Sequence, residues 1–116
     1  MTNNIRKELG KIKNVKFGHV GYNDAGLGIQ FELGGESWGV CDTKWTWDYN
    51  LIERDEYTRW TEEEREKVHI EMLKFISDLL RDAKVDSIEK LKGKPIEVSF
   101  RDFNMLDSWR ILSEVL

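Results

Sequence analysis

Residues 27–33 constrain the fold most, because apolar and non-apolar side chains alternate strictly there between two glycine-rich turns. The apolar face carries Leu27, Ile29, Phe31 and Leu33. A period of two over this length is typical of a β-strand with one buried face. Gly34 and Gly35 follow at once, and such a pair favours the positive φ angles of a tight hairpin. We therefore expect a strand joined to its neighbour by a short turn.

Strands are predicted on both sides of this segment. Residues 12–20 carry β-prone apolar side chains, with imperfect alternation between Ile12 and Val15 that indicates either a bulge or a later strand start. Residues 21–26 have turn chemistry, since Gly and Asn tolerate positive φ and Asp bonds its own backbone. A third strand is expected over 37–42, with Trp38 and Val40 on one face. The first third of the chain thus predicts a three-stranded antiparallel meander.

No period fits residues 43–60, which are rich in aromatic and charged side chains. Trp45 and Trp47 can extend the third strand past a bulge. We interpret the remainder as a long aromatic loop, a kind of segment that is often functional in a compact domain.

A helix is predicted from Glu62 to about Lys84. Thr61 and Glu64 form a capping box, in which each side chain bonds the backbone N–H of the other. Apolar residues then recur at helical spacing and form one stripe. This stripe comprises Val68, Met72, Phe75, Ile76, Leu79 and Ala83.

The remaining elements are a short helix and two strands. Asp86-Ser87 caps a helical segment through Leu91 that ends at Gly93, and strands are expected over 96–100 and from Trp109 onward, with a turn over 102–107. The order β-β-β-α-α-β-β, without βαβ alternation, predicts an α+β fold: an antiparallel sheet with one long amphipathic helix packed on it. Residues 1–10 are expected to be a flexible N-terminus, and residues 11–116 a single α+β domain.

Composition excludes several classes of protein. The 116 residues include one cysteine, carry a net charge of −4 and contain no long apolar run. We therefore expect a cytoplasmic protein with no intrachain disulfide, no membrane segment and no nucleic acid polymer as partner. A small phosphorylated ligand remains compatible, because two or three well-placed arginines suffice for a diphosphate.

No motif for catalysis or metal binding stands out. Cys41, His19 and His69 lack paired metal-ligand spacing, and the glycines match no phosphate-binding fingerprint. We interpret Cys41 as a small apolar filler on a strand face and His69 as a partly buried helix residue. The sequence favours a binding protein that is not an enzyme and has no metal or cofactor.

Two turns are candidate binding surfaces. The first offers Tyr22, Asn23 and Asp24, although a tight hairpin alone would also explain these residues. The C-terminal hairpin offers polar, aromatic and basic side chains around one turn, among them the residue types that a purine and a pyrophosphate need. They are Arg101, Phe103, Asn104, Ser108 and Arg110. The alternative is that Phe103 belongs to the core and both arginines are solvated.

Three segments of the chain resemble a family of phage and prophage proteins. They are KIKNVKFGHVGYNDAGLG from Lys11, SWGV in the third strand and SWRILSEVL at the C-terminus. They resemble the first anti-Thoeris (Thoeris anti-defence) sponge family over nearly the whole chain from Lys11.

The resemblance implies a protein that binds cyclic ADP-ribose signals, and in related members cyclic oligonucleotides, without degrading them. It also implies a homo-oligomer, a dimer or larger, with pockets between subunits in which stacking holds adenine and arginine holds the diphosphate. Arg110 would be the matching arginine, and the aromatic segment with Trp47 would supply a further wall. The alternative function is a protein-interaction adaptor or inhibitor that uses a Trp-rich surface.

Overall fold

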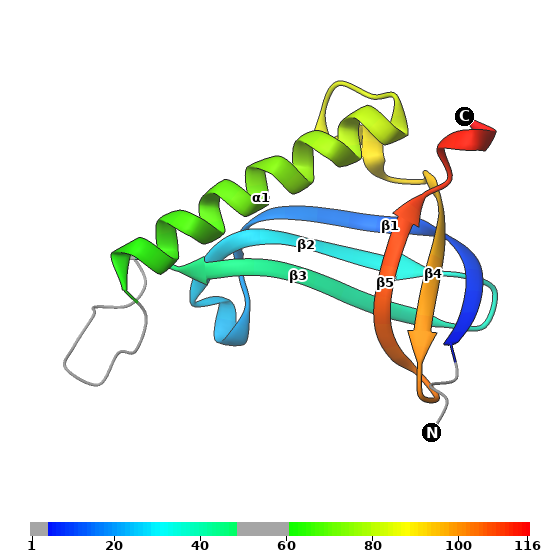
Figure 1. Ribbon diagram of the computed structural model, residues 1–116, viewed down its shortest axis with the longest axis horizontal. Helices are drawn as coiled ribbons and strands as arrows, with labels where there is room; N and C mark the ends of the chain where they lie inside the picture. Colours follow the sequence, from blue (N-terminus) through cyan, green and yellow to red (C-terminus); the bar gives the residue numbers. More distant parts are fainter. Residues whose placement is uncertain (1–4, 49–60) are drawn as a thin grey trace.

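The computed structural model describes residues 5–48 and 61–116, which form an α+β fold with one sheet and one long helix (Figure 1). The five-stranded antiparallel sheet has the order β3-β2-β1-β4-β5. Its strands are β1 (Ile5–Val20), β2 (Gly26–Gly34), β3 (Gly39–Trp47), β4 (Pro95–Arg101) and β5 (Met105–Ile111). The helix is α1 (Glu62–Ala83), and three single turns of 3-10 helix are η1 (Tyr22–Asp24), η2 (Ile88–Leu91) and η3 (Ser113–Val115).

β1 is long and belongs to two halves of the sheet. Its first part pairs with β4, from Ile5 opposite Arg101 to Lys11 opposite Pro95, and its second part pairs with β2 from Lys11 to Val20. Residues 5–10, expected to be flexible, are instead strand residues with a continuous β4 partner. The predicted meander is confirmed, as is a bulge in β1, where the register with β2 shifts between Ile12 and Asn14.

The sheet curls so strongly that its two edge strands approach each other. In Figure 1, β4 and β5 run across the direction of β1, β2 and β3. The indole Nε1 of Trp109 on β5 donates a 2.7 Å hydrogen bond to Oδ2 of Asp42 on β3. β3 and β5 lie at opposite ends of the strand order, so this bond joins the two edges of one sheet.

Helix α1 lies over the curled sheet and closes the core. Its capping box is confirmed: the Glu64 amide donates to Thr61 Oγ1 at 3.2 Å, and the Thr61 amide donates to the Glu64 carboxylate at 3.4 Å. Lys84 ends the helix in the left-handed conformation. The apolar stripe packs on side chains from β1, β2, β4 and β5. The fully buried ones are Ile12, Ile29, Phe31, Ile96, Val98 and Phe100.

Several boundaries differ from the prediction. The second helix is only the 3-10 turn η2, whose N-cap Ser87 makes no side-chain capping bond. β3 continues without a register shift to Trp47, and β5 already begins at Met105, so the turn before it is shorter than predicted. The aromatic loop expected after Trp47 falls mostly on residues 49–60, outside the described residues. Among the described helices, none is long and apolar enough to cross a membrane.

Candidate functional site: the seam between β3 and β5

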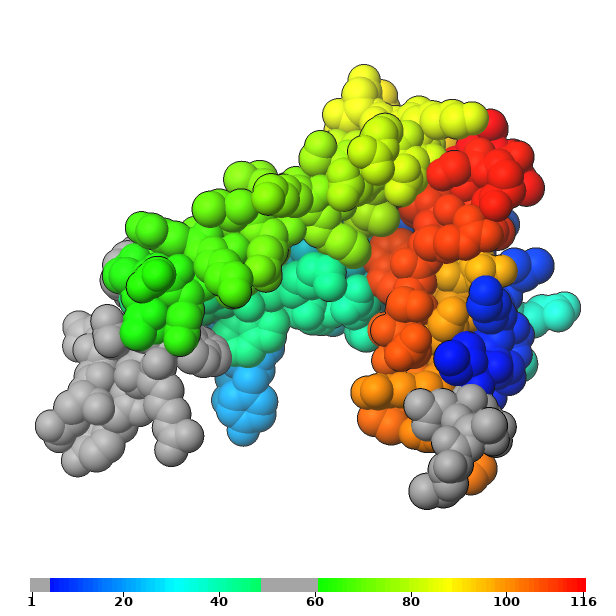
Figure 2. Space-filling view, in the orientation of Figure 1, coloured from blue at the N-terminus to red at the C-terminus, as the bar shows by residue number. Residues whose placement is uncertain are grey.

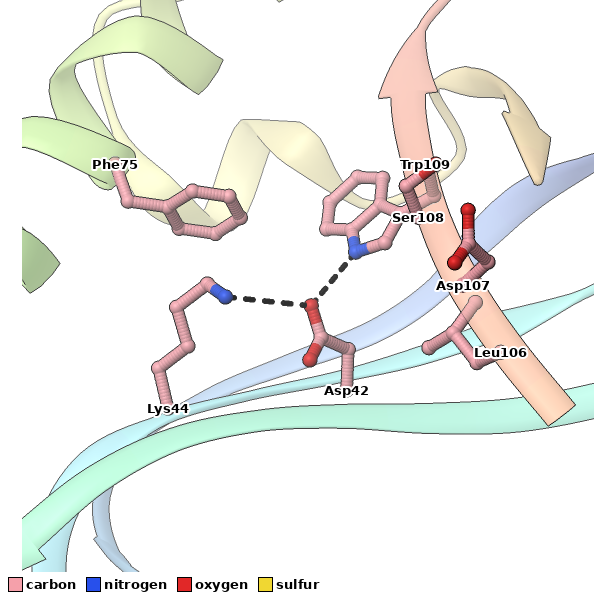
Figure 3. Close-up of a pocket in the computed structure, with 7 residues that line it drawn as sticks. All are labelled: Asp42, Lys44, Phe75, Leu106, Asp107, Ser108 and Trp109. Atoms are coloured by element: carbon pink, nitrogen blue, oxygen red, sulfur yellow. Dashed lines mark hydrogen bonds and ion pairs between the residues drawn. The ribbon is translucent and has the colours of Figure 1, made fainter. Parts of the chain in front are cut away.

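The strongest candidate site is the seam, which we define as the gap between the inner faces of β3 and β5 beneath α1. Figure 2 shows the molecular surface hollowed where α1, β3 and β5 meet. One pocket of about 270 Å³ opens there (Figure 3). It is lined by Asp42, Lys44, Phe75, Leu106, Asp107, Ser108 and Trp109.

Two aromatic rings form the wall of this first pocket. Phe75 of α1 and Trp109 of β5 meet edge to face, with ring centroids 6.0 Å apart, and both contact the buried Phe31. The Lys44 ammonium lies 4.4 Å from the centre of the Phe75 ring and 3.9 Å from the Asp42 carboxylate. Aromatic and aliphatic surface beside a cation and a hydroxyl suits a ligand that is part planar ring and part polar group.

A bulge in β5 adds a carboxylate to the same pocket. Ser99 pairs with Ser108 and Phe100 with Leu106, so Asp107 has no opposite residue on β4. A bulge of this kind re-aims a side chain and is common beside functional sites. Asp107 lines the pocket together with the half-buried Asp42.

A second pocket of about 440 Å³ follows along the seam. It is lined by Arg6, Glu8, Ser37, Trp38, Gly39, Val40, Phe100 and Asn104. The Arg6 guanidinium lies 4.9 Å from the Phe100 ring centre and donates to the Phe103 carbonyl at 2.9 Å and to Asn104 Oδ1 at 3.1 Å. Glu8 accepts an ion pair from Arg6 Nε at 3.2 Å.

The two pockets are consecutive along both strands. On β3, Asp42 and Lys44 line the first, while Val40 and Gly39 line the second. The β5 side continues in the same way from Leu106 of the first pocket to Asn104 of the second. The seam is therefore one elongated site with a ring pair at each end: Phe75 with Trp109, and Trp38 with Phe100, whose centroids lie 5.3 Å apart.

The charges in the seam are mixed. Arg6 and Lys44 are its cations, and Glu8, Asp42 and Asp107 are its carboxylates. Within residues 5–48 and 61–116, no group of three His, Cys, Asp or Glu side chains could hold a metal ion. The seam thus offers donors, acceptors and stacking surfaces side by side.

The residues predicted at the first turn lie far from the seam. Asn23 and Asp24 have positive φ angles in η1, and Tyr22 is exposed. η1 follows the Val20 end of β1, whereas the β4–β5 turn lies beside its Ile5 end, so the two predicted turns are at opposite ends of the longest strand. Trp47 is on the η1 side and is 1% exposed, with the Arg65 guanidinium 5.2 Å from its ring centre.

Of the residues predicted at the C-terminal hairpin, Asn104 and Ser108 line the seam. Phe103 is 93% exposed in the turn, so it does not belong to the core. Arg101 is exposed beside it. Arg110 lies on the outer face of β5, opposite Glu97.

Arg110 is held by two carboxylates on that outer face. Its Nη1 donates to Glu114 at 3.0 Å and its Nε to Glu97 at 3.2 Å. The bond with Glu114, followed by that with Glu97, raises the pKa of Arg110, and the bond from Arg110 lowers the pKa of Glu114. Within one chain these carboxylates, rather than a ligand, satisfy the guanidinium.

Sequence reasoning missed most of the seam. Arg6 and Glu8 lie in the stretch expected to be flexible, and Lys44 lies in the segment that no period fits. Asp42 and Trp109 lie in predicted strands without an assigned role. A signal was available: charged side chains at alternate positions in a strand, where apolar ones are expected, indicate an inner face that opens to solvent. Cys41, expected to be an apolar filler, is exposed on the opposite face of β3.

No protein-family profile, no curated protein and no solved structure matches this chain.

Proposed function

We propose that this protein binds a nucleotide-derived signal of the cyclic ADP-ribose type in the seam and sequesters it without degrading it. The observation that carries the proposal is the order of groups along the seam. The half-buried rings of Trp38, Phe75 and Trp109 line it, with Arg6, Asn104, Lys44 and Ser108 between and beside them. Rings stack on a base, cations pair with phosphates, and an amide reads a base edge. The biological role we propose is that of a phage anti-defence sponge in the host cytoplasm.

The carboxylates of the seam favour a ribose-containing ligand over a bare phosphate. Asp42 and Asp107 repel anions, but they accept hydrogen bonds from neutral hydroxyls, as acidic residues do for ribose in dinucleotide sites. The second pocket, at about 440 Å³, falls within the usual range for small-molecule sites. A compact ligand with separate base, ribose and phosphate parts matches this mixture better than a simple anion does.

Arg110 enters the proposal through the sequence resemblance alone. It lies on the outer face, so a ligand in the seam of the same chain does not contact it. In a homo-oligomer, which we also propose, the outer face of a second subunit can complete a shared pocket. Replacing Arg110 therefore distinguishes a pocket between subunits from a seam that binds alone.

The test is to incubate the purified protein with cyclic ADP-ribose isomers from a TIR-enzyme lysate, denature it and identify the released molecule by mass spectrometry. We expect an intact cyclic isomer. Lys44→Met keeps the aliphatic stem over Phe75 and removes the charge, so it should release much less ligand, while Lys74→Met on the exposed side of α1 is the matched control. A hydrolysed product would mean that the protein is an enzyme, and an empty protein would contradict the proposal.

The alternative function is a protein-interaction adaptor or inhibitor with a Trp-rich surface. Trp38, Trp45, Trp47 and Trp109 are all buried or half-buried, and Trp60 lies outside the described residues. The described tryptophans therefore form no exposed patch. Exposed apolar side chains gather elsewhere, beside the second half of β1.

A further inference from the structure

The second half of β1 has an open backbone edge. Residues 5–11 of β1 pair with β4, which begins at Pro95. Beyond them, only Ile12 makes backbone hydrogen bonds on this edge, with Gly93 and Lys94. Residues 13–20 pair with β2 on their other side. Within the described parts of the chain, no strand pairs with residues 13–20 on the β4 side of β1. An open row of backbone donors and acceptors is a template for one more strand.

An apolar groove lies between this edge and α1. It has a volume of about 230 Å³ and is lined by Phe17, Leu27, His69, Met72, Leu73 and Ile76. Phe17 on β1 is 54% exposed and Leu73 on α1 is 69% exposed, although both are large apolar side chains. The groove is smaller than a typical small-molecule site, and its size suits one apolar anchor side chain of a peptide.

His69, which lines the groove, has an unpaired polar atom. Nε2 of His69 is buried and has no hydrogen-bond partner among the described residues. An unpaired buried nitrogen is costly unless a bound group satisfies it. This observation points to an occupant with its own polar atoms, which an extended peptide has in every residue.

Lysines surround the same edge. Lys13 and Lys16 are exposed on β1, and Lys92 and Lys94 lie on the loop that bonds Ile12. Among residues 5–48 and 61–116, none of these four lysines makes an ion pair, in a protein whose net charge is −4. Lysines on an open edge disfavour pairing with a second copy, because Lys13 and Lys16 of the two chains would meet.

We propose that this edge and groove bind an extended acidic segment of a partner protein as an additional β-strand. The backbone of this segment forms hydrogen bonds with residues 13–20. Its alternate apolar side chains enter the groove beside Phe17 and Leu73, and its carboxylates face Lys13 and Lys16. The groove shares no lining residue with the seam. The proposal is therefore independent of the small-molecule function.

The test uses a fluorescein-labelled peptide that alternates valine with glutamate, measured by fluorescence anisotropy against the intact protein. We expect saturable binding that weakens as salt rises, and binding at least about tenfold weaker for a valine–lysine peptide. Each surface lysine should contribute about threefold in affinity, and charge reversal should cost more. Lys16→Glu should therefore weaken binding strongly, while Lys74→Glu, the same charge change outside the groove, should leave it unchanged.

Hydrogen exchange locates the bound peptide. We expect the amides of residues 13–20 to exchange more slowly with the valine–glutamate peptide present. Equal affinity for both peptides, no anisotropy change up to about 1 mM peptide, or protection confined to other residues would overturn the proposal. Self-association protecting residues 13–20, detected by sedimentation together with exchange, would assign this edge to a second copy and also overturn it.

Discussion

Replacing Trp109 with phenylalanine removes the donor that joins the two edge strands. The 2.7 Å bond ends on the Asp42 carboxylate, and hydrogen bonds to charged groups contribute about 1.5–3 kcal/mol. The Asp42 side chain retains 21% exposure, so water replaces part of the lost bond. We therefore assign about 1.5 kcal/mol to the loss of this hydrogen bond. The smaller ring also loses part of its contact with Phe31 and Phe75, about 0.5–1 kcal/mol.

We therefore expect Trp109→Phe to lower the free energy of unfolding by about 2 kcal/mol, or the melting temperature by roughly 8 °C. The assay is urea denaturation followed by circular dichroism, for Trp109→Phe, Asp42→Ala and the double variant. The hydrogen bond should appear as a coupling energy of about 1–1.5 kcal/mol between the two sites.

The matched control is Asp78→Ala, which removes an exposed carboxylate of α1 that pairs with Arg81 at 3.3 Å. It should change stability by less than about 0.5 kcal/mol. If Trp109→Phe and Asp42→Ala are additive within about 0.5 kcal/mol, the bond does not hold the edges together and the seam is not defined by it.

Three further predictions concern single sites. The Arg110 bond keeps the pKa of Glu114 below its ordinary value of 4.5, so Glu114 stabilises the fold above that pH and loses this effect as pH falls through its folded pKa. Glu114→Gln should therefore lower the melting temperature at pH 7 and match the wild type near about pH 3. His69→Leu should raise stability by about 1 kcal/mol in thermal melts, because it removes an unpaired buried nitrogen; a clear loss would show that His69 has a partner. A Cβ on Gly28 would clash with the Lys44 carbonyl oxygen, so Gly28→Ala should cost about 2–3 kcal/mol in urea unfolding, whereas Gly39→Ala, with only an ordinary contact, should cost little.

The elements with a local signal were predictable. The alternation of β2, the capping box at Thr61 and the apolar stripe of α1 each follow from short-range chemistry, and the structure confirms them. The bulge near Ile12 was also visible as an interruption in alternation. Such features need no knowledge of the rest of the chain.

The first part of β1 was missed because its signal is inverted. Its inner face carries Arg6, Glu8 and Gly10, where a buried strand would carry apolar residues, while Leu9 points outward and is exposed. A Cβ at Gly10 would clash with the Gly34 carbonyl oxygen and with the Trp38 ring. This segment is a strand only because it pairs with the distant β4. A local sequence pattern does not predict such long-range pairing.

The candidate site was missed for a related reason. Purine-like chemistry was expected at the exposed tip of the C-terminal hairpin, but the structure places Phe103 in solvent and offers Trp38 and Phe100 as the ring pair. Their meeting depends on the curl of the sheet, which brings β3 to β4 and β5. Of the residues predicted at this hairpin, Asn104 and Ser108 line the seam.

The division of β1 between two partners has a consequence for synthesis on the ribosome. β2 and β3 follow β1 closely, so the meander can form early. By contrast, Arg6 and Phe103, which are joined by a hydrogen bond, are 97 residues apart in sequence. At ribosomal rates, β4 and β5 are synthesised roughly 5–20 s after the first half of β1. During that interval the nascent chain carries an unpaired strand, and this is when we expect it to depend most on chaperones.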